Sequence, residues 1–286
     1  MNKVRKTEKL LLCTDLDRTL IPNGNEPASE NSLELFRKLA NQPEVTLVYV
    51  TGRDQNLVLQ AINEYNLPLP SIVLADVGSS IYKINDQIWT FVSEWEEIIS
   101  SDWKGMFAND IEKLLVGIKN IELQESSKQN RHKLSYYASL NSDSEQLINQ
   151  LKNILDLNSI ACNFIWSIDE QANVGLLDVL PASAGKRQAI EFIMNNLNFD
   201  FSNTIFSGDS GNDICVMSSP IKSILVANAN VKVKESAVNA AMSNNQMSTL
   251  YLAKGDYLNM NGNYSAGILE GVAHYKPNIE KLFRMA

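Results

Sequence analysis

Two carboxylates, Asp15 and Asp17, lie one residue apart, and only Thr14 separates the first from the apolar run Leu10 to Cys13. A short apolar run bounded by turn residues is typical of a buried strand, so both acids are expected at the end of a strand. Neighbouring carboxylates raise each other's pKa unless a cation or hydrogen-bond donors intervene, and a hard divalent cation is a suitable partner. An isolated Asp-x-Asp is more often a solvated turn or a helix N-cap, so other residues must favour the metal.

Two further segments place polar groups where a strand gives way to a helix. The segment "VYVTGRD" puts Thr51 and Gly52 after the apolar run Val45 to Val50, where a hydroxyl and a backbone N–H can hold an anion. The segment "LPASAGKRQAI" puts Lys186 at a helix start, where its ammonium and the positive helix end can both face a phosphate. Taken singly, the first is an ordinary capped turn and the second a solvated surface lysine.

The segment "FSGDSGNDI" carries a second acidic cluster. Gly208 and Gly211 allow a tight turn, which presents Asp209, Asn212 and Asp213 just beyond a strand-like run. A capped helix is the alternative interpretation. Because ligands bind at the carboxyl ends of strands in an open parallel sheet, all of these groups are expected to converge on one site.

The segments "DLDRT", "VTGR", "AGK" and "GDSGND", in this order, resemble the four motifs of the haloacid dehalogenase (HAD) superfamily. The resemblance extends over nearly the whole chain. The insertion between Thr51 and Lys186 is similar to the large α/β (C2-type) cap of the sucrose-phosphate phosphatase group, in which "VGSSIY", "KQNRHKLSYY", "LDVLP" and "SAGILEGVAHY" also have counterparts. Arg18 and Leu20 stand where that group usually carries Asn and an aromatic residue, and Ser80 stands where it usually carries Glu.

The resemblance implies a Mg²⁺-dependent phosphatase that acts on a sugar phosphate, sucrose-6-phosphate or a related glycoside phosphate, through an aspartyl-phosphate. Asp15 is the expected nucleophile, and Asp17 the expected general acid and base. Thr51, Lys186 and backbone amides are expected to stabilise the transferring phosphoryl group. The phosphate-binding residues that we expect are Thr51, Gly52, Lys186 and Asn212.

A Mg²⁺ ion between Asp15 and the second acidic cluster would offset the repulsion of the acidic pair and leave Asp15 ionised. We expect Asp209 to be a direct ligand and Asp213 to bind directly or through water. The resemblance implies that the main-chain carbonyl of Asp17 is a further ligand. Asn212 is expected to orient Lys186 or the phosphate.

The cap is expected to choose the sugar, chiefly through "KQNRHKLSYY". Strand alternation puts Arg131, Lys133, Ser135 and Tyr137 on one face and His132, Leu134 and Tyr136 on the other. A strand with one solvated face would show the same pattern, and the family resemblance favours a substrate role for Gln129, Lys133 and Ser135. The final helix, which includes His274, is expected to have a packing role.

The order of the elements predicts an α/β fold. Strand-like and helical segments alternate up to "SIVLA", which is typical of a parallel sheet. Between about Tyr82 and Asp178 the pattern changes to "IELQE" and "KLSYYAS" separated by helical segments, and all four tryptophans lie here. We predict a Rossmann-like core of residues 1–82 and 179–286 with an inserted α+β cap domain of residues 83–178. The core resumes with helix Lys186 to Asn196, strand "NTIFS", a helix from about Asn212, strand "KSILVA" and helix Ala266 to His274.

Composition excludes several classes of protein. The 286 residues are 44% hydrophobic, enough to form one large or two moderate domains, and the net charge of −8 argues against a nucleic-acid partner. The widely spaced Cys13, Cys162 and Cys215 indicate neither a disulfide framework nor a zinc site. No stretch approaches the roughly 18 apolar residues of a membrane span. A cytoplasmic enzyme with a small-molecule sugar-phosphate partner and no membrane or nucleic-acid partner is therefore expected, with its oligomeric state open.

Three alternatives stay open from the residues. A sugar phosphomutase of the same superfamily would keep the phosphate on Asp15 and return it to a sugar. A dehalogenase is less consistent with the chain, because Asp17 supplies the second acid of a phosphatase. A receiver-like phospho-aspartate signalling module also uses an acidic pocket and a lysine, but it has no use for so large a cap.

Overall fold

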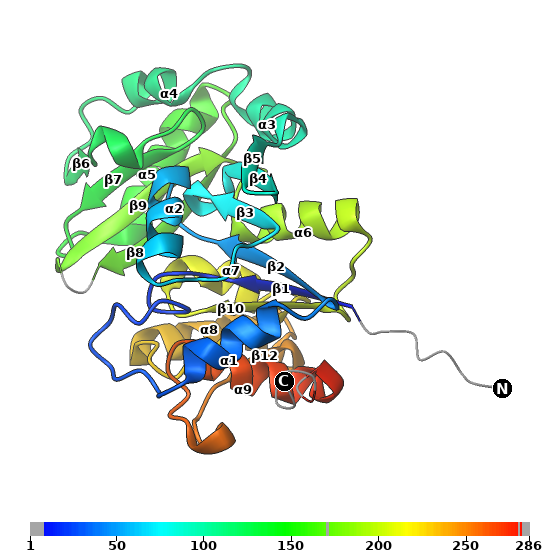
Figure 1. Ribbon diagram of the computed structural model, residues 1–286. Coiled ribbons are helices and arrows are strands. Elements are labelled where there is room, and N and C mark those ends of the chain that lie inside the picture. The colour runs from blue at the N-terminus through cyan, green and yellow to red at the C-terminus, as the bar shows by residue number, and fades with distance from the viewer. Residues whose placement is uncertain (1–8, 170–171, 280, 282–286) are drawn as a thin grey trace.

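A sheet of eight strands forms the core of the protein, with the order β12-β11-β10-β1-β2-β3-β4-β5. The computed structural model describes residues 9–169, 172–279 and 281 (Figure 1). The strands from β12 to β3 in this order run parallel, and β4 and β5 continue the sheet in antiparallel pairing. The strands are β1 (Leu10–Thr14), β2 (Val45–Val50), β3 (Ile72–Ala75), β4 (Ser80–Asn85), β5 (Ile88–Phe91), β10 (Thr204–Gly208), β11 (Lys222–Leu225) and β12 (Leu250–Leu252).

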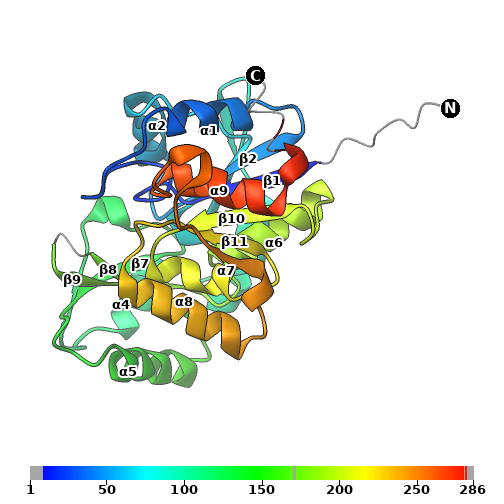
Figure 2. The same cartoon turned by 90° about the horizontal axis from the view of Figure 1, so that it is seen from below.

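Helices cover both faces of this sheet because its central strands are apolar on both sides. In β1, Leu11 and Cys13 join one apolar cluster and Leu10 and Leu12 the other, as alternation requires. The first cluster includes residues of α3 (Ser93–Ser100), α6 (Lys186–Leu197), α7 (Ile214–Met217) and α8 (Val231–Ser243), and the second those of α1 (Ser32–Ala40), α2 (Gln55–Glu64) and α9 (Ser265–Tyr275). Figure 2 shows α1 and α9 side by side.

A second, smaller sheet of four antiparallel strands makes up the cap, seen in green at the upper left of Figure 1. Its order is β6-β7-β9-β8, with β6 (Ile121–Leu123), β7 (Leu134–Ala138), β8 (Cys162–Asp169) and β9 (Val174–Pro181). One face packs on α4 (Ala108–Leu114) and α5 (Ser144–Leu157) around the buried Trp103. Short 3₁₀ segments are η1 (Asp76–Gly78), η2 (Ser101–Trp103), η3 (Ser126–Lys128), η4 (Gly211–Asp213), η5 (Met247–Thr249) and η6 (Tyr257–Asn259).

The predicted α/β core with an inserted α+β cap is confirmed, but the sheets divide the chain at other places than the sequence suggested. The hairpin β4–β5 extends the large sheet as far as Phe91, and β9 keeps the chain in the cap sheet as far as Pro181. This hairpin was not predicted, because β5 is an edge strand whose side chains are mostly exposed and lack a buried apolar pattern. The domain division at residues 82 and 178 remains a prediction.

The carboxyl ends of the parallel strands carry the polar residues. Asp15 follows β1, Thr51 follows β2, Asp76 follows β3, and Asp209 follows β10. These ends meet at one edge of the sheet, under the cap, and define the candidate site. Within the part of the chain that the structure describes, no helix has both the length and the apolar character to span a bilayer.

Candidate active site

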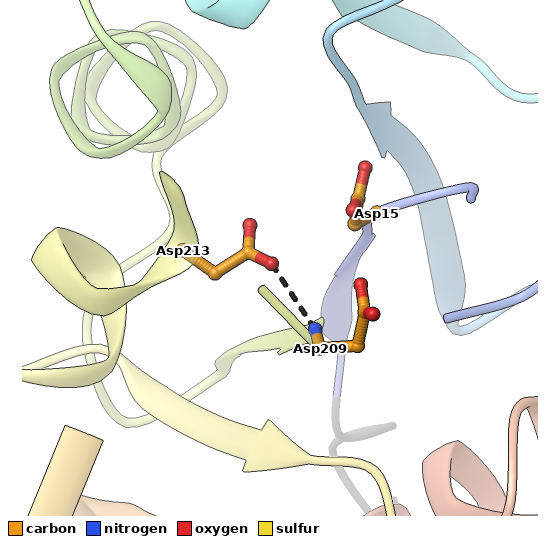
Figure 3. A group of neighbouring side chains, drawn as sticks. All are labelled: Asp15, Asp209 and Asp213. Carbon is orange, nitrogen blue, oxygen red and sulfur yellow. Dashed lines mark hydrogen bonds between the residues drawn. The ribbon is translucent and has the colours of Figure 1, made fainter. Parts of the chain in front are cut away.

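Three buried carboxylates, those of Asp15, Asp209 and Asp213, form the centre of the site (Figure 3). Each offers one oxygen within 4.8 Å of the oxygens of the other two. Asp15 comes from the end of β1, and the other two from the turn after β10, so the parallel pairing of β1 with β10 brings them together. The predicted convergence of the two acidic segments is therefore a feature of the structure.

Lys186 is the buried cation among these acids. Its Nζ lies 2.7 Å from Asp213 Oδ1 and 3.3 Å from Asp15 Oδ1, and it donates to Asn212 Oδ1 at 2.8 Å. Burial alone would lower the pKa of Lys186, but the charges of Asp15 and Asp213 outweigh it and raise that pKa. The lysine therefore stays protonated, and Asn212 holds its ammonium in place.

The acids carry more charge than Lys186 can offset. Burial raises the pKa of Asp15 well above its usual range, with Lys186 acting against this shift and Asp213 and Asp209 adding to it. Burial and then the charge of Asp213 raise the pKa of Asp209 to about 7. A buried set of oxygen ligands with excess negative charge suits a hard divalent cation such as Mg²⁺. The residues present thus fit the metal that the sequence implied.

Asp213 closes the turn that carries the second acidic cluster. Its Oδ2 accepts hydrogen bonds from the backbone N–H groups of Asp209 and Ser210, both at 3.1 Å. The first is the dashed line in Figure 3. A Cβ at Gly208 would lie 2.5 Å from the carboxylate carbon of Asp213, so only glycine allows this turn.

Asp17 lies apart from the acidic trio and is held by Arg53. Arg53 Nη2 donates to Asp17 Oδ1 at 2.6 Å, Arg53 Nε donates to Oδ2 at 2.8 Å, and Asn23 Nδ2 donates to Oδ1 at 2.7 Å. Burial raises the pKa of Asp17, but the hydrogen bonds and charge of Arg53 together with the Asn23 bond outweigh burial and lower that pKa. Arg53 therefore holds the Asp17 carboxyl in its ionised form.

The predicted phosphate-binding turn lies beside Asp17. Thr51 is buried at the end of β2, and its Oγ1 accepts the N–H of Arg53 at 3.2 Å. Gly52 is exposed, and a Cβ there would meet only Val77 Cγ2, at 3.8 Å. The structure thus leaves room for a ligand over Gly52.

A contact between two glycines places Lys186. Gly78 has φ +88°, and a Cβ on it would lie 2.5 Å from the carbonyl carbon and oxygen of Gly185 and 2.9 Å from the N of Lys186. The segment of η1 therefore packs backbone to backbone against the start of α6. This approach fixes the point at which Lys186 enters the site.

Gly78→Ala is expected to lower the free energy of unfolding by about 1–3 kcal/mol through overpacking, and to reduce activity by displacing Lys186. Gly117→Ala is the matched control, because Gly117 has φ +89° but nothing lies within 4 Å of a Cβ there. Chemical denaturation measures the free energy of unfolding of both variants. Both substitutions put alanine at a positive φ, and only Gly78→Ala adds a steric clash, so the difference between them gives the cost of the clash. Equal losses in the two variants would show that the glycine contact is unimportant.

The cap contacts the catalytic core through polar groups. Lys133 Nζ lies 3.2 Å from Asp76 Oδ1, with both side chains buried. Asn130 Nδ2 donates to Ser79 Oγ at 2.9 Å and to Ser80 Oγ at 3.3 Å. These contacts join the loop before β7 to the turn after β3, beside the phosphate-binding turn.

The other two cap residues that are expected to bind the sugar, Ser135 and Gln129, differ in the hydrogen bonds that they make. Ser135 Oγ donates to Asp178 Oδ1 at 2.5 Å, on the face of β7 opposite Leu134 and Tyr136, which pack in the cap core. Gln129 is committed to the main chain, because its Nε2 donates to the carbonyls of Gln124 and Ser135 and its Oε1 accepts the N–H of Ser135. Burial raises the pKa of Asp178, against the effects of Lys133 and Ser135.

Strand β8 of the cap also reaches the core loops. Asn163 Nδ2 donates to the carbonyl of Ala184 at 2.8 Å. A Cβ on Gly211 would lie 3.1 Å from the carbonyl oxygen of Trp166, so glycine at this position lets the cap strand approach the acidic turn. His274 lies elsewhere, stacked on Tyr251 with ring centroids 4.4 Å apart, which agrees with a packing role.

Several residues at the site escaped the sequence analysis. Arg53 was visible in "VTGR", and Asp76 follows a predicted strand. The rule that ligands bind at the carboxyl ends of parallel strands, here called the strand-end rule, could have found both. Asn23, Asn130 and Asp178 carry no local signal, because their partners come from distant segments or from backbone geometry.

Comparison with known proteins agrees with this geometry. The family model described as sucrose-6F-phosphate phosphohydrolase matches residues 8–276. A protein of Nitrosococcus oceani described as a HAD-like hydrolase is 46% identical over 94% of this chain and 72% of its own length. A probable sucrose-phosphatase 2 of Arabidopsis thaliana is 25% identical over 98% of this chain, which spans 63% of that relative.

A solved structure is similar over the whole fold. The sucrose-phosphatase of Synechocystis sp. PCC6803, in complex with sucrose and phosphate, superposes with a TM-score of 0.76 at 24% identity, covering 94% of this chain and 98% of that one. Likeness at this level of identity establishes a common HAD fold.

Proposed function

The chain belongs to the sucrose-6F-phosphate phosphohydrolase family, a family of phosphoric monoester hydrolases of the HAD superfamily, and on this premise we propose a Mg²⁺-dependent enzyme that hydrolyses a sugar phosphate. The substrate class that we propose is sucrose-6-phosphate or a related glycoside phosphate. The observation that carries the proposal is the buried contact of Lys186 with both Asp15 and Asp213. It sets a carboxylate nucleophile beside a fixed positive charge at the end of a strand.

In the first step, an oxygen of Asp15 attacks the phosphorus in line, and the bond from phosphorus to the sugar oxygen breaks. The product on the enzyme is an aspartyl-phosphate. Lys186, the Thr51 hydroxyl and the Gly52 amide stabilise the charge on the equatorial oxygens. Because Lys186 is already fixed by Asn212 and Asp213, little reorganisation is needed as the phosphoryl group transfers.

Asp17 moves the protons. It gives a proton to the leaving sugar oxygen, and it then removes a proton from the water that hydrolyses the aspartyl-phosphate. Arg53 keeps the pKa of Asp17 low, which suits its role as the base but not its role as the acid. An arriving phosphate dianion competes for Arg53, and loss of that contact raises the pKa of Asp17, so that it takes up a proton from solvent before it delivers one to the leaving oxygen.

Asp15, Asp209 and Asp213, with the main-chain carbonyl of Asp17, would hold the Mg²⁺. When bound, the ion supplies charge neutralisation at the transferring phosphoryl group. The chain's own contribution is the buried acidic trio, whose excess charge favours such an ion.

The cap supplies the groups that select the sugar. Lys133 lies at the contact between cap and core, and Ser135 donates to Asp178 within the cap, so hydroxyl groups of a sugar would find both donors and acceptors here. Gln129 holds the loop through main-chain contacts, and we assign it the positioning of Ser135, while its contact with the substrate stays a prediction.

The proposal is tested by phosphate release from sucrose-6-phosphate, trehalose-6-phosphate, glucose-6-phosphate and p-nitrophenyl phosphate, each with MgCl₂ and with EDTA. We expect Mg²⁺-dependent release, fastest from a disaccharide phosphate. Transfer of phosphate to a second sugar hydroxyl without free phosphate would indicate a phosphomutase instead. Stable labelling of Asp15 without turnover would indicate a signalling module.

Lys133→Ala is expected to reduce kcat/KM for the sugar phosphate by about 10- to 100-fold, because a charged hydrogen-bond donor to the sugar is lost. Hydrolysis of p-nitrophenyl phosphate should change little, since its leaving group offers no hydroxyls. Lys113→Ala is the control, because Lys113 is an exposed cap lysine. Equal losses on both substrates would assign Lys133 a structural role.

A further inference from the structure

We propose that Arg18 is a built-in competitor for the divalent cation, because its guanidinium pairs with Asp209, one of the carboxylates that would hold Mg²⁺. The inference rests on the metal site of the proposed function. Arg18 Nε lies 3.4 Å from Asp209 Oδ2, and Thr19 Oγ1 donates to Asp209 Oδ1 at 3.1 Å. Both oxygens of this carboxylate are thus engaged by the protein itself.

Backbone conformation and hydrogen bonds hold the main chain of Arg18 in place. Arg18 has φ 56°, a left-handed conformation that is uncommon for an arginine. Its N–H donates to Asn23 Oδ1 at 2.8 Å, and its carbonyl accepts from Asn228 Nδ2 at 2.6 Å. Two amide side chains from different segments therefore hold the peptide groups on both sides of this residue, and they aim it at Asp209.

Among the residues that the structure describes, Lys186 and Arg18 are cations that contact the acidic trio, and they differ in burial. Lys186 is fully buried and contacts Asp15, Asp213 and Asn212 together. The Arg18 side chain is 25% exposed, so of these two cations it is the one in contact with solvent. The arginine is therefore the charge that a divalent cation at Asp209 would displace.

The ion pair of Arg18 with Asp209 should lower the affinity of the site for Mg²⁺ and raise the stability of the protein without Mg²⁺. Arg18 offsets the charge of a buried carboxylate while no metal is bound, and it repels a dication that arrives there. Removing the guanidinium should tighten Mg²⁺ binding by the free energy of a partly exposed ion pair, about 2- to 5-fold in Kd.

The test is a titration of the full chain with MgCl₂ alone, by calorimetry and by the Mg²⁺-induced rise in melting temperature. Arg18→Asn is the variant of choice, because Asn tolerates a left-handed backbone and should fold. Any change in backbone strain is present with and without metal, so it cancels from the Mg²⁺-induced rise. Substrate is absent, so the outcome is independent of whether the phosphatase proposal holds.

We expect Arg18→Asn to bind Mg²⁺ about 2- to 5-fold more tightly than the unaltered protein and to gain more in melting temperature from it. Arg131→Asn, which removes a cap arginine paired with Glu96, controls for net charge and should change nothing. In an Asp209→Asn background, Arg18→Asn should no longer tighten binding. Unchanged or weaker binding in Arg18→Asn, or equal tightening in Arg131→Asn, would overturn the proposal.

Discussion

Replacing Asp15 with asparagine is expected to reduce phosphate release by more than about 10⁴-fold, a loss of the size seen when an enzyme nucleophile is removed. The amide has nearly the same shape as the carboxyl, but it cannot form the aspartyl-phosphate. Phosphate release with saturating sugar phosphate and MgCl₂ measures the effect. Residual turnover above about one part in a hundred would exclude Asp15 as the nucleophile.

The fold of Asp15→Asn should survive. The pKa of Asp15 is raised in the folded state, so at neutral pH its ionised form destabilises the metal-free fold relative to the unfolded chain. A neutral amide removes this cost, and Lys186 keeps its contacts with Asp213 and Asn212. The melting temperature in EDTA should therefore not fall, which separates lost chemistry from lost structure. Asp110→Asn, a change on the cap surface, serves as the control.

The strand-end rule explains why the centre of the site was predictable. Asp15, Thr51 and Asp209 each follow a buried apolar run, and parallel pairing must bring such ends together at one edge. Gly208 and Gly211 marked the turn that carries Asp209 and Asp213. The sequence thus contained both the chemistry and the element that positions it.

Contacts that depend on how the cap meets the core were not predictable. The ion pair of Lys133 with Asp76 joins segments far apart in the chain, and nothing in either segment alone indicates the other. The approach of Gly78 to Gly185 is likewise a long-range backbone contact. The direction of a side chain could not be predicted from the sequence either. The segment "VTGR" does not show that the Arg53 side chain points towards Asp17 and not towards solvent.

Asp17→Asn is expected to slow hydrolysis of a sugar phosphate by about 10²- to 10⁴-fold, the usual worth of a positioned general acid and base. A sugar alkoxide is a poor leaving group and needs the proton, whereas nitrophenolate leaves without one. The formation of the aspartyl-phosphate from p-nitrophenyl phosphate should therefore be much less affected. Rapid-quench kinetics on both substrates, at equal MgCl₂, measure the two rates.

The same variant should trap the intermediate, because Asp17 also activates the water of the second step. With p-nitrophenyl phosphate, we expect a burst of nitrophenolate, followed by slow turnover and by phosphate retained on the protein. Asn23→Ala is an informative companion, since it removes the hydrogen bond to Asp17 Oδ1 and the one that the Arg18 N–H donates to Asn23, but leaves the carboxyl and its Arg53 contacts in place. It should slow both substrates far less than Asp17→Asn. If Asp17→Asn loses equal rate on the two substrates and shows no burst, Asp17 does not move the protons, and its contact with Arg53 serves only to shape the phosphate-binding turn.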